Sequence, residues 1–330
     1  MKFGIGIPTC REGQALPTPM VTPASLQKMA LEADRLGLDY LWADDFRVPS
    51  PDMHIPYPTP PNWYEVLVSL AYMARITTRI RIGTGVMVLP LREPVLLAKQ
   101  AATLDHLSNG RLFLGVGLGV SRDEFVSLNP KNPKANRGKI VDEVLEALEI
   151  LLYSNLASYK GEYFEFNNIS IYPKPVQKHI PLYFVSLEQD TSHNLDRLSQ
   201  MGQGVLVSSN PVKAQERIKL ISEVLVKAGR KPSEVDFGSY GVMSIAKTRQ
   251  EALAQYQVNR VSHRTKGWTD EQVMARHYIG TPAEVIEKIG KLKEAGITQC
   301  VVNQFPVDSM DGMVEHLRRY GEQILPAFKK

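Results

Sequence analysis

Residues 81–117 read RIGTGVMVLPLREPVLLAKQAATLDHLSNGRLFLGVG, and their pattern decides the fold. An apolar run rich in β-branched residues at 81–88 is followed by a helical pattern over about 94–107, which starts at a proline. A Ser-Asn-Gly turn ends this helix, and a second apolar run follows at 112–116. Because a crossover of this length joins parallel strands, the stretch is expected to form one β-α-β unit.

The same alternation continues in both directions along the chain. Apolar β-type runs are expected at residues 3–7, 39–43, 81–88, 112–116, 182–186, 205–208, 237–245 and 298–303. Helical patterns follow them, over about 23–37, 63–76, 94–107, 137–152, 191–201, 211–228, from 249, 282–295 and 310–325. A proline-rich loop at 49–61 and excursions at 161–181 and 262–277 interrupt the order.

Eight β-α units are the number that closes a TIM-type (β/α)₈ barrel. The sequence therefore predicts an α/β fold, a single barrel domain over residues 1–330, with insertions after strands four and seven. A doubly wound open sheet is the alternative architecture. That fold would favour a phosphate-binding fingerprint after the first strand, and Gly4-Ile5-Gly6 does not complete one.

Composition excludes several classes of function. Of 330 residues 43% are apolar and 22% charged, and the net charge of +4 arises from dispersed basic residues. Binding to nucleic acid or to a membrane surface is therefore not expected. Cys10 and Cys300 lie far apart in the sequence, which favours a reducing compartment, and no stretch is typical of a signal peptide or a membrane span. We expect a cytoplasmic protein.

Catalytic groups of such barrels lie at the carboxyl ends of the strands. Asp44 and Asp45 follow the second predicted strand, and Asp44 is expected either to bind a polar ligand or to cap a turn. The seven histidines show no metal-ligand spacing, so no metal site is predicted. Lys247, at the end of the seventh strand, leaves open an imine-forming lyase.

Several segments together resemble the bacterial-luciferase-like flavin-dependent oxidoreductases. They are RIGTGVMVLP at 81–90, LDHLSNGRL at 104–112, GVGLG at 115–119, YPKPVQ at 172–177 and GTPAE at 280–284. The likeness runs in a consistent order from residue 3 to about residue 325, and the LDHLSNGRL segment is its most specific part.

The resemblance implies a flavin at the barrel mouth, either FMN or the deazaflavin F420. Asp44 would contact the ring or ribityl region, and Gly85-Val86 matches the place where many members have a non-prolyl cis peptide bond. Gly117 and Leu118 would lie along the ribityl chain. The phosphate would be held by the residues at the start of the fifth helix and just before it, namely Ser186, Thr191 and Ser192.

Two departures from the family pattern favour FMN over F420. Deazaflavin-using members commonly have a histidine where this chain has Asp45, and several have an acid where it has Val120. Histidine exchanges protons near neutral pH, as hydride exchange with a reduced substrate requires. We expect a two-component monooxygenase, in which a separate reductase supplies reduced FMN for the oxidation of a small or medium organic substrate. An F420-dependent reductase or dehydrogenase and a non-catalytic flavin-binding protein are the alternatives.

The remaining candidate residues follow from position and residue type. Residues 262–277 are expected to form either a lid or a surface loop. For the assembly, the resemblance implies a homodimer or a larger homo-oligomer. Proton handling or substrate hydrogen bonding is assigned to Asp45, His277 and Gln304. The substrate pocket is expected to use large apolar side chains, namely Trp42, Phe46, Trp63, Met87, Phe125 and Trp268.

Overall fold

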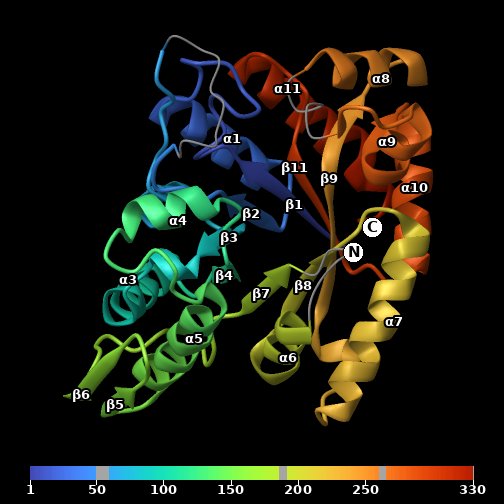
Figure 1. Cartoon of the computed structure of the whole chain (residues 1–330). Helices are drawn as coiled ribbons and strands as arrows, with labels where there is room; N and C mark the ends of the chain where they lie inside the picture. The colour runs from blue at the N-terminus through green and yellow to red at the C-terminus, as the bar shows by residue number, and fades with distance from the viewer. Residues whose placement is uncertain (50–58, 186–191, 260–264, 330) are drawn as a thin grey trace.

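Eight parallel strands close into a barrel in the computed structural model, as the sequence predicts (Figure 1). The structure describes residues 1–49, 59–185, 192–259 and 265–329. Around the barrel the strands are β1 (Lys2–Ile7), β2 (Tyr40–Ala43), β3 (Arg81–Val88), β4 (Leu112–Gly117), β7 (Leu182–Val185), β8 (Gly204–Val207), β9 (Asp236–Ile245) and β11 (Gln299–Gln304). Pairing of β11 with β1, in the register Val301 to Gly4, completes the ring.

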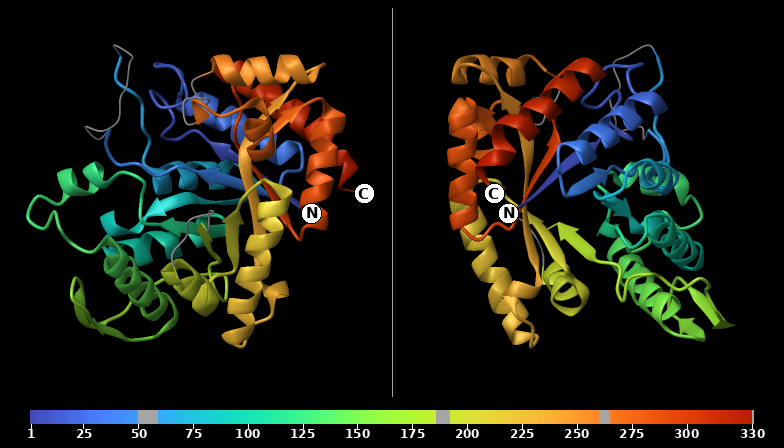
Figure 2. Two further views of the ribbon diagram at one scale, coloured as in Figure 1. Left: turned by 45° about the vertical axis from the view of Figure 1, so that its right-hand side comes forward. Right: turned by 180° about the vertical axis from the view of Figure 1, so that it is seen from behind.

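Helices surround the strands on the outside (Figures 1 and 2). They are α1 (Pro23–Arg35), α2 (Val66–Ile76), α3 (Pro94–Leu107), α5 (Arg137–Tyr153), α6 (Ser192–Met201), α7 (Pro211–Lys227), α8 (Arg249–Val258), α10 (Pro282–Glu294) and α11 (Met310–Arg319). Side-chain caps determine where these helices begin, as α10 shows. The Thr281 hydroxyl accepts from the Glu284 amide, the Glu284 carboxylate accepts from the Thr281 amide, and Pro282 occupies the first helical position.

The structure contains further elements after β4 and after α8 that were not predicted individually. After β4 come α4 (Arg122–Leu128) and, beyond α5, the antiparallel strands β5 (Ala157–Lys160) and β6 (Glu165–Ile169), which lie at the periphery (Figure 2). After α8 come α9 (Asp270–Arg276) and β10 (Tyr278–Gly280), which pairs with the upper part of β9. Most of the expected proline-rich loop, residues 50–58, lies outside the described residues.

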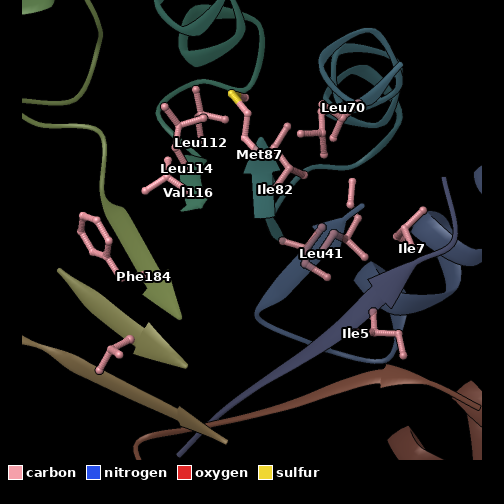
Figure 3. Packing of buried hydrophobic residues seen from close by; sticks show 14 of the residues in the cluster. Ile5, Ile7, Leu41, Leu70, Ile82, Met87, Leu112, Leu114, Val116 and Phe184 are labelled. Carbon is pink, nitrogen blue, oxygen red and sulfur yellow. The ribbon is translucent and has the colours of Figure 1, made fainter. Parts of the chain in front are cut away.

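One apolar core fills the space between the strands and the helices. Figure 3 shows outward-facing side chains of neighbouring strands, such as Ile5, Leu41 and Ile82, in the same layer as Leu70 of α2. Burial of this continuous layer is the main force that holds the helices on the barrel. Among the described residues, no helix combines the length and the apolar character that crossing a membrane would require.

A second core lies inside the barrel and is built from large side chains that face glycines. It contains Tyr40, Trp42, Phe113, Tyr183, Leu206 and Val301. A Cβ atom on Gly204 would lie 2.1 Å from the Tyr183 ring, and one on Gly83 would lie 2.6 Å from the Phe113 ring. The glycines therefore make room for the aromatic rings. This filled interior forms the floor of the barrel mouth.

Candidate functional site

A cavity of about 540 Å³ opens at the carboxyl ends of the strands, where barrels carry their active sites. Its lining comes from β3, β4, β7, β8 and β9, from the first turn of α6 and from the loops that follow β1, β2 and β4. The lining residues are Arg11, Asp44, Asp45, Phe46, Gly85, Val86, Val88, Val116, Gly117, Leu118, Gly119, Val120, Val185, Asn194, Leu206 and Tyr240.

Arg11 and Asp44 form a buried, bidentate ion pair on one wall. The Arg11 Nε atom donates to Asp44 Oδ2 at 2.6 Å, and Nη2 donates to Oδ1 at 2.5 Å. Burial alone would lower the pKa of Arg11, but the charge of Asp44 and the hydrogen bonds to Asp44 and Tyr240 together raise that pKa. The Thr9 hydroxyl also donates to the Asp44 carbonyl oxygen at 2.8 Å. Asp44 therefore reaches the cavity as one half of a fixed, paired group.

Tyr240 extends this network across the mouth. Its hydroxyl oxygen lies 3.5 Å from Arg11 Nη2 and 3.1 Å from the Asn303 side-chain nitrogen. Arg276 Nη1 donates to the Tyr240 carbonyl oxygen at 2.7 Å, which fixes the strand at this position. Groups from the loop after β1 and from β9 and β11 thus meet at the Tyr240 hydroxyl.

Asp45 also lines the cavity, but its hydrogen-bond partners differ from those of Asp44. Its Oδ2 atom accepts from the Val88 amide at 2.9 Å, and its Oδ1 atom accepts from Arg92 Nη2 at 2.6 Å. Arg92 also pairs with Glu65 at 2.8 Å. Burial raises the pKa of Asp45, and the charge of Arg92 offsets this only in part. With 2% of its side chain exposed, Asp45 is a buried member of an ion-pair network.

The β3 wall contains the expected unusual peptide bond. The Gly85-Val86 bond is cis and non-prolyl, as the family resemblance implies, and the pairing of β3 with β4 shifts its register between Thr84 and Met87. A Cβ atom on Gly117 would lie 2.9 Å from the Val86 side chain. Val86 and the backbone of Gly117 therefore form a closely fitted wall against which a flat ring could lie.

Two arginines fix the loop after β4 and the start of α6 at the rim of the cavity. Arg137 Nη1 donates to the carbonyl oxygens of Leu118, Gly119 and Ser121 at 3.3–3.5 Å. Arg197 of α6 pairs with Asp142 of α5 at 2.6 Å and donates to the Asn194 side-chain oxygen at 3.0 Å. The start of α6 is thereby anchored beside the cavity.

The residues expected to bind a cofactor are brought together in part. Asp44, Gly85, Val86, Gly117 and Leu118 all line the cavity. Ser186 and Thr191 lie outside the described residues. Ser192 begins α6, and its side chain also lies outside the described part, so the phosphate contacts remain a prediction.

Of the three residues assigned to proton handling, only Asp45 lines the cavity. Gln304 is buried, and its side-chain nitrogen donates to the Ala15 carbonyl oxygen at 3.3 Å. His277 follows α9, and its Nδ1 atom accepts from the Val242 amide at 3.3 Å. Burial, with the charges of Arg276 and Lys288, lowers the pKa of His277 to about 3.

The aromatic and apolar residues expected in the substrate pocket occupy several environments. Phe46 lines the main cavity, and it also lines an adjoining cavity of about 350 Å³ together with Trp63. Trp42 lies in the inner core beneath the mouth. Met87 of β3 and Phe125 of α4 belong to the core between strands and helices.

The two remaining features from the sequence lie away from the cavity lining. Trp268 is 45% exposed and precedes α9. Residues 262–264 of the expected lid lie outside the described part, so the lid remains a prediction. Lys247 lines a separate cavity of about 510 Å³ near Pro282 and Arg319. The described residues contain no group of three or more metal-ligating side chains.

Arg11, Tyr240 and Asn194 are site residues that sequence reasoning did not identify. Arg11 lies four residues beyond the end of β1 at Ile7, so the strand-end rule pointed near it without selecting it. Tyr240 lies in the middle of β9, so the strand-end rule does not select it. The only signal in the sequence is the length of this strand, because in a ten-residue strand the middle can lie level with the mouth.

Comparison with known proteins identifies the family. Residues 1–299 match the family model described as luciferase-like monooxygenase, so the chain belongs to the luciferase-like monooxygenase family. An uncharacterized protein of Mycobacterium tuberculosis is 36% identical over 163 residues, which are 49% of this chain and 56% of that protein. The match thus spans about half the length of this relative.

Solved structures share the whole fold. The coenzyme F420-dependent tetrahydromethanopterin reductase of Methanopyrus kandleri has a TM-score of 0.76 and 24% identity, with 99% of both chains covered. The oxygenating constituent of 3,6-diketocamphane monooxygenase from Pseudomonas putida, in complex with FMN, also has a TM-score of 0.76, at 17% identity, with 99% of this chain and 98% of that chain covered. The family fold therefore occurs with both cofactors.

Proposed function

We propose that this protein is the oxygenating component of a two-component monooxygenase, which binds reduced FMN at the barrel mouth and oxidises a small or medium organic substrate with oxygen. A separate flavin reductase would supply the reduced cofactor. Membership of the luciferase-like monooxygenase family supports oxidoreductase chemistry. The proposal extends that family membership to one cofactor and one reaction class.

The cavity has the size and the wall that a flavin requires. Its volume of about 540 Å³ falls within the range of about 300–1,000 Å³ typical of ligand sites. Gly85, Val86 and Gly117 line one wall, where Val86 packs so closely against Gly117 that a side chain at Gly117 would collide with it. Across the cavity, the Arg11–Asp44 pair would orient the polar edge of the ring.

The state of Asp45 is the observation that favours FMN over F420. Its carboxylate is held by Arg92 and by the Val88 amide, and no histidine is found in the cavity lining within the described ranges. Hydride exchange between a deazaflavin and an alcohol needs a group that takes up a proton near neutral pH, for which histidine is suited. Bound reduced flavin supplies electrons to oxygen directly, and the residues here would mainly orient it and exclude water.

Cofactor titration tests the proposal. Apoprotein would be titrated separately with FMN, with reduced FMN under anaerobic conditions and with F420, while fluorescence is followed. We expect binding of FMN in both redox states and weaker binding of F420. Tight binding of F420 without binding of FMN would favour the F420-dependent reductase, and no binding of any of them would contradict the proposal.

Matched variants connect binding to the cavity. Val185→Trp places a large side chain in the cavity and should abolish FMN binding, whereas Val226→Trp, at a position that is 62% exposed on α7, should leave it unchanged. Oxygen uptake with reduced FMN and a panel of organic substrates then tests turnover. Bound flavin without substrate-dependent oxygen uptake would favour the non-catalytic flavin-binding protein.

The expected assembly is part of the same proposal. A homodimer or larger homo-oligomer is proposed on family grounds, and light scattering after gel filtration measures it. A monomer at micromolar concentration would contradict this part and would leave the cofactor proposal standing.

A further inference from the structure

The hydroxyl group of Tyr240 has a use that the proposed function does not assign. We propose that Tyr240 donates its hydroxyl hydrogen to an uncharged carbonyl oxygen of the molecule bound in the cavity. This deepens the proposed function and rests on it for the cavity being a ligand site. No bond to hydrogen breaks; the contact polarises the C=O group.

The direction of the hydrogen bonds carries the inference. The Tyr240 oxygen lies 3.5 Å from Arg11 Nη2 and 3.1 Å from Asn303 Nδ2, and both nitrogens can only donate. The oxygen therefore accepts twice, and its own hydrogen must point elsewhere. Within the described residues no protein acceptor for that hydrogen is found, and the side chain lines the cavity. A bound molecule is the remaining acceptor.

The donor is held in place before any ligand arrives. Arg11 is fixed by two hydrogen bonds to Asp44, at 2.6 Å and 2.5 Å, and the Tyr240 backbone is held by Arg276 at 2.7 Å. Both donors to the Tyr240 oxygen also withdraw electron density from it, which strengthens the O–H group as a donor. Arg11 and Asn303 are thus positioning residues, and Tyr240 is the group that touches the ligand.

Charge and surroundings define the acceptor. Each charged side chain in the cavity lining has a partner, since Arg11 pairs with Asp44 and Arg92 neutralises Asp45. The neighbours of Tyr240 in the lining include Val185 and Leu206, which are apolar. With no unpaired cation in this part of the lining for an anion to meet, the Tyr240 hydroxyl group favours an uncharged oxygen acceptor. A carbonyl group has that chemistry.

A carbonyl oxygen can come from two sources, the cofactor ring or a separate substrate, and two measurements distinguish them. In the first, difference infrared spectra are recorded for acetophenone bound to the protein with and without FMN. In the second, the affinity for FMN is measured by titration. Each uses wild type, Tyr240→Phe and the control Tyr153→Phe, whose hydroxyl accepts from the Ile180 amide at 2.8 Å and lies outside the cavity lining.

Two results support the proposal and assign the source. A carbonyl stretch of bound acetophenone that is lowered in wild type and in Tyr153→Phe, but not in Tyr240→Phe, identifies the substrate carbonyl. A loss of FMN affinity of about fivefold in Tyr240→Phe alone, as expected for one hydrogen bond, identifies the ring carbonyl. Tyr240→Phe behaving as wild type in both measurements would overturn the proposal.

A second variant tests the direction of the bond. Asn303→Asp replaces a donor with an acceptor, which would capture the Tyr240 hydrogen, so the same loss is expected as in Tyr240→Phe. Full retention of the wild-type signal would overturn the assigned direction. If wild type binds neither FMN nor F420, the proposed function fails; the acetophenone spectra of the cofactor-free protein still decide the role of Tyr240.

Discussion

The lower half of the barrel interior and the mouth above it are built on the same strands, yet one is densely packed and the other encloses a cavity. Below, large rings such as Trp42, Phe113 and Tyr183 face glycines and leave no space. Above, the inward side chains are paired ions, a tyrosine and valines around a cavity of about 540 Å³. The lower layer therefore provides packing, and the upper layer provides fixed charges at defined positions.

The largest effect should come from breaking an ion pair at the mouth. Arg92→Met leaves the buried Asp45 carboxylate without its cation, so we expect a loss of about 3–5 kcal/mol in the free energy of unfolding at pH 8. Chemical denaturation measures it. The double variant Arg92→Met/Asp45→Asn removes both charges and should recover most of the loss; no recovery would mean that Arg92 acts through packing.

The pH dependence of the same variant sharpens the result. Burial already raises the pKa of Asp45, and removal of Arg92 should raise it further. An acid whose pKa rises on folding binds more protons in the folded state, so the stability of the variant should increase as pH falls. A loss that is equal at pH 8 and pH 5 would argue against a charged Asp45.

Overfilling the lower layer should have the next largest effect. Gly204→Ala places a Cβ atom 2.1 Å from the Tyr183 ring, and we expect a loss of about 1–3 kcal/mol in the free energy of unfolding. Gly290→Ala in α10 is the matched control, because nothing lies within 4 Å of its Cβ; it should stabilise the protein by up to about 1 kcal/mol. FMN affinity should be unchanged in both.

His277 lies outside the cavity lining, so its titration should change the free energy of unfolding and not substrate turnover. Its pKa of about 3 in the folded protein lies below the ordinary value of 6.5, so the unfolded chain binds the extra proton between these values. Stability should therefore fall as pH falls below 6.5, by up to about 1.4 kcal/mol for each pH unit.

The difference between wild type and His277→Gln isolates this contribution. The free energy of unfolding would be measured for both from pH 7.5 to 5, and the wild-type curve should be the steeper one. Parallel curves would mean that His277 titrates normally in the folded protein. A selective effect on substrate turnover would instead support the proton-handling role that its sequence position suggested.

The smallest effect is expected at Trp42 in the lower layer. The Trp42 indole nitrogen is buried and, within the described residues, has no hydrogen-bond partner. Trp42→Phe removes this unsatisfied group while it loses some packing, so the two effects should nearly cancel, to within about 1 kcal/mol. Urea denaturation followed by circular dichroism measures it. A much larger loss would indicate a partner for the nitrogen, such as a buried water molecule.

Much of the architecture could be predicted from the sequence, because it follows from short-range patterns. The alternation of apolar strands and capped helices predicts the closed barrel, and the run 81–119 points to the Gly85-Val86 bond through family resemblance. Asp44 and Asp45 could be placed at the mouth by the strand-end rule.

The partners of these acids could not be predicted, because they come from distant parts of the chain. Arg11 meets Asp44 across 33 positions of sequence, and Arg92 meets Asp45 across 47. No local pattern specifies such pairs. The direction in which an apolar side chain faces is equally a three-dimensional property, which is why Met87 of β3 lies in the outer core.

The length of β9 connects Tyr240 to a part of the structure beyond the barrel ring. Its lower residues pair with β8 and β11 inside the ring, while Met243, Ser244 and Ile245 continue upward and pair with β10. Arg276, at the end of α9, donates to the Tyr240 carbonyl oxygen, so the overhanging segment is attached to the strand that carries the proposed donor. A change in this extension would therefore alter the backbone position of Tyr240 through one continuous strand and one arginine.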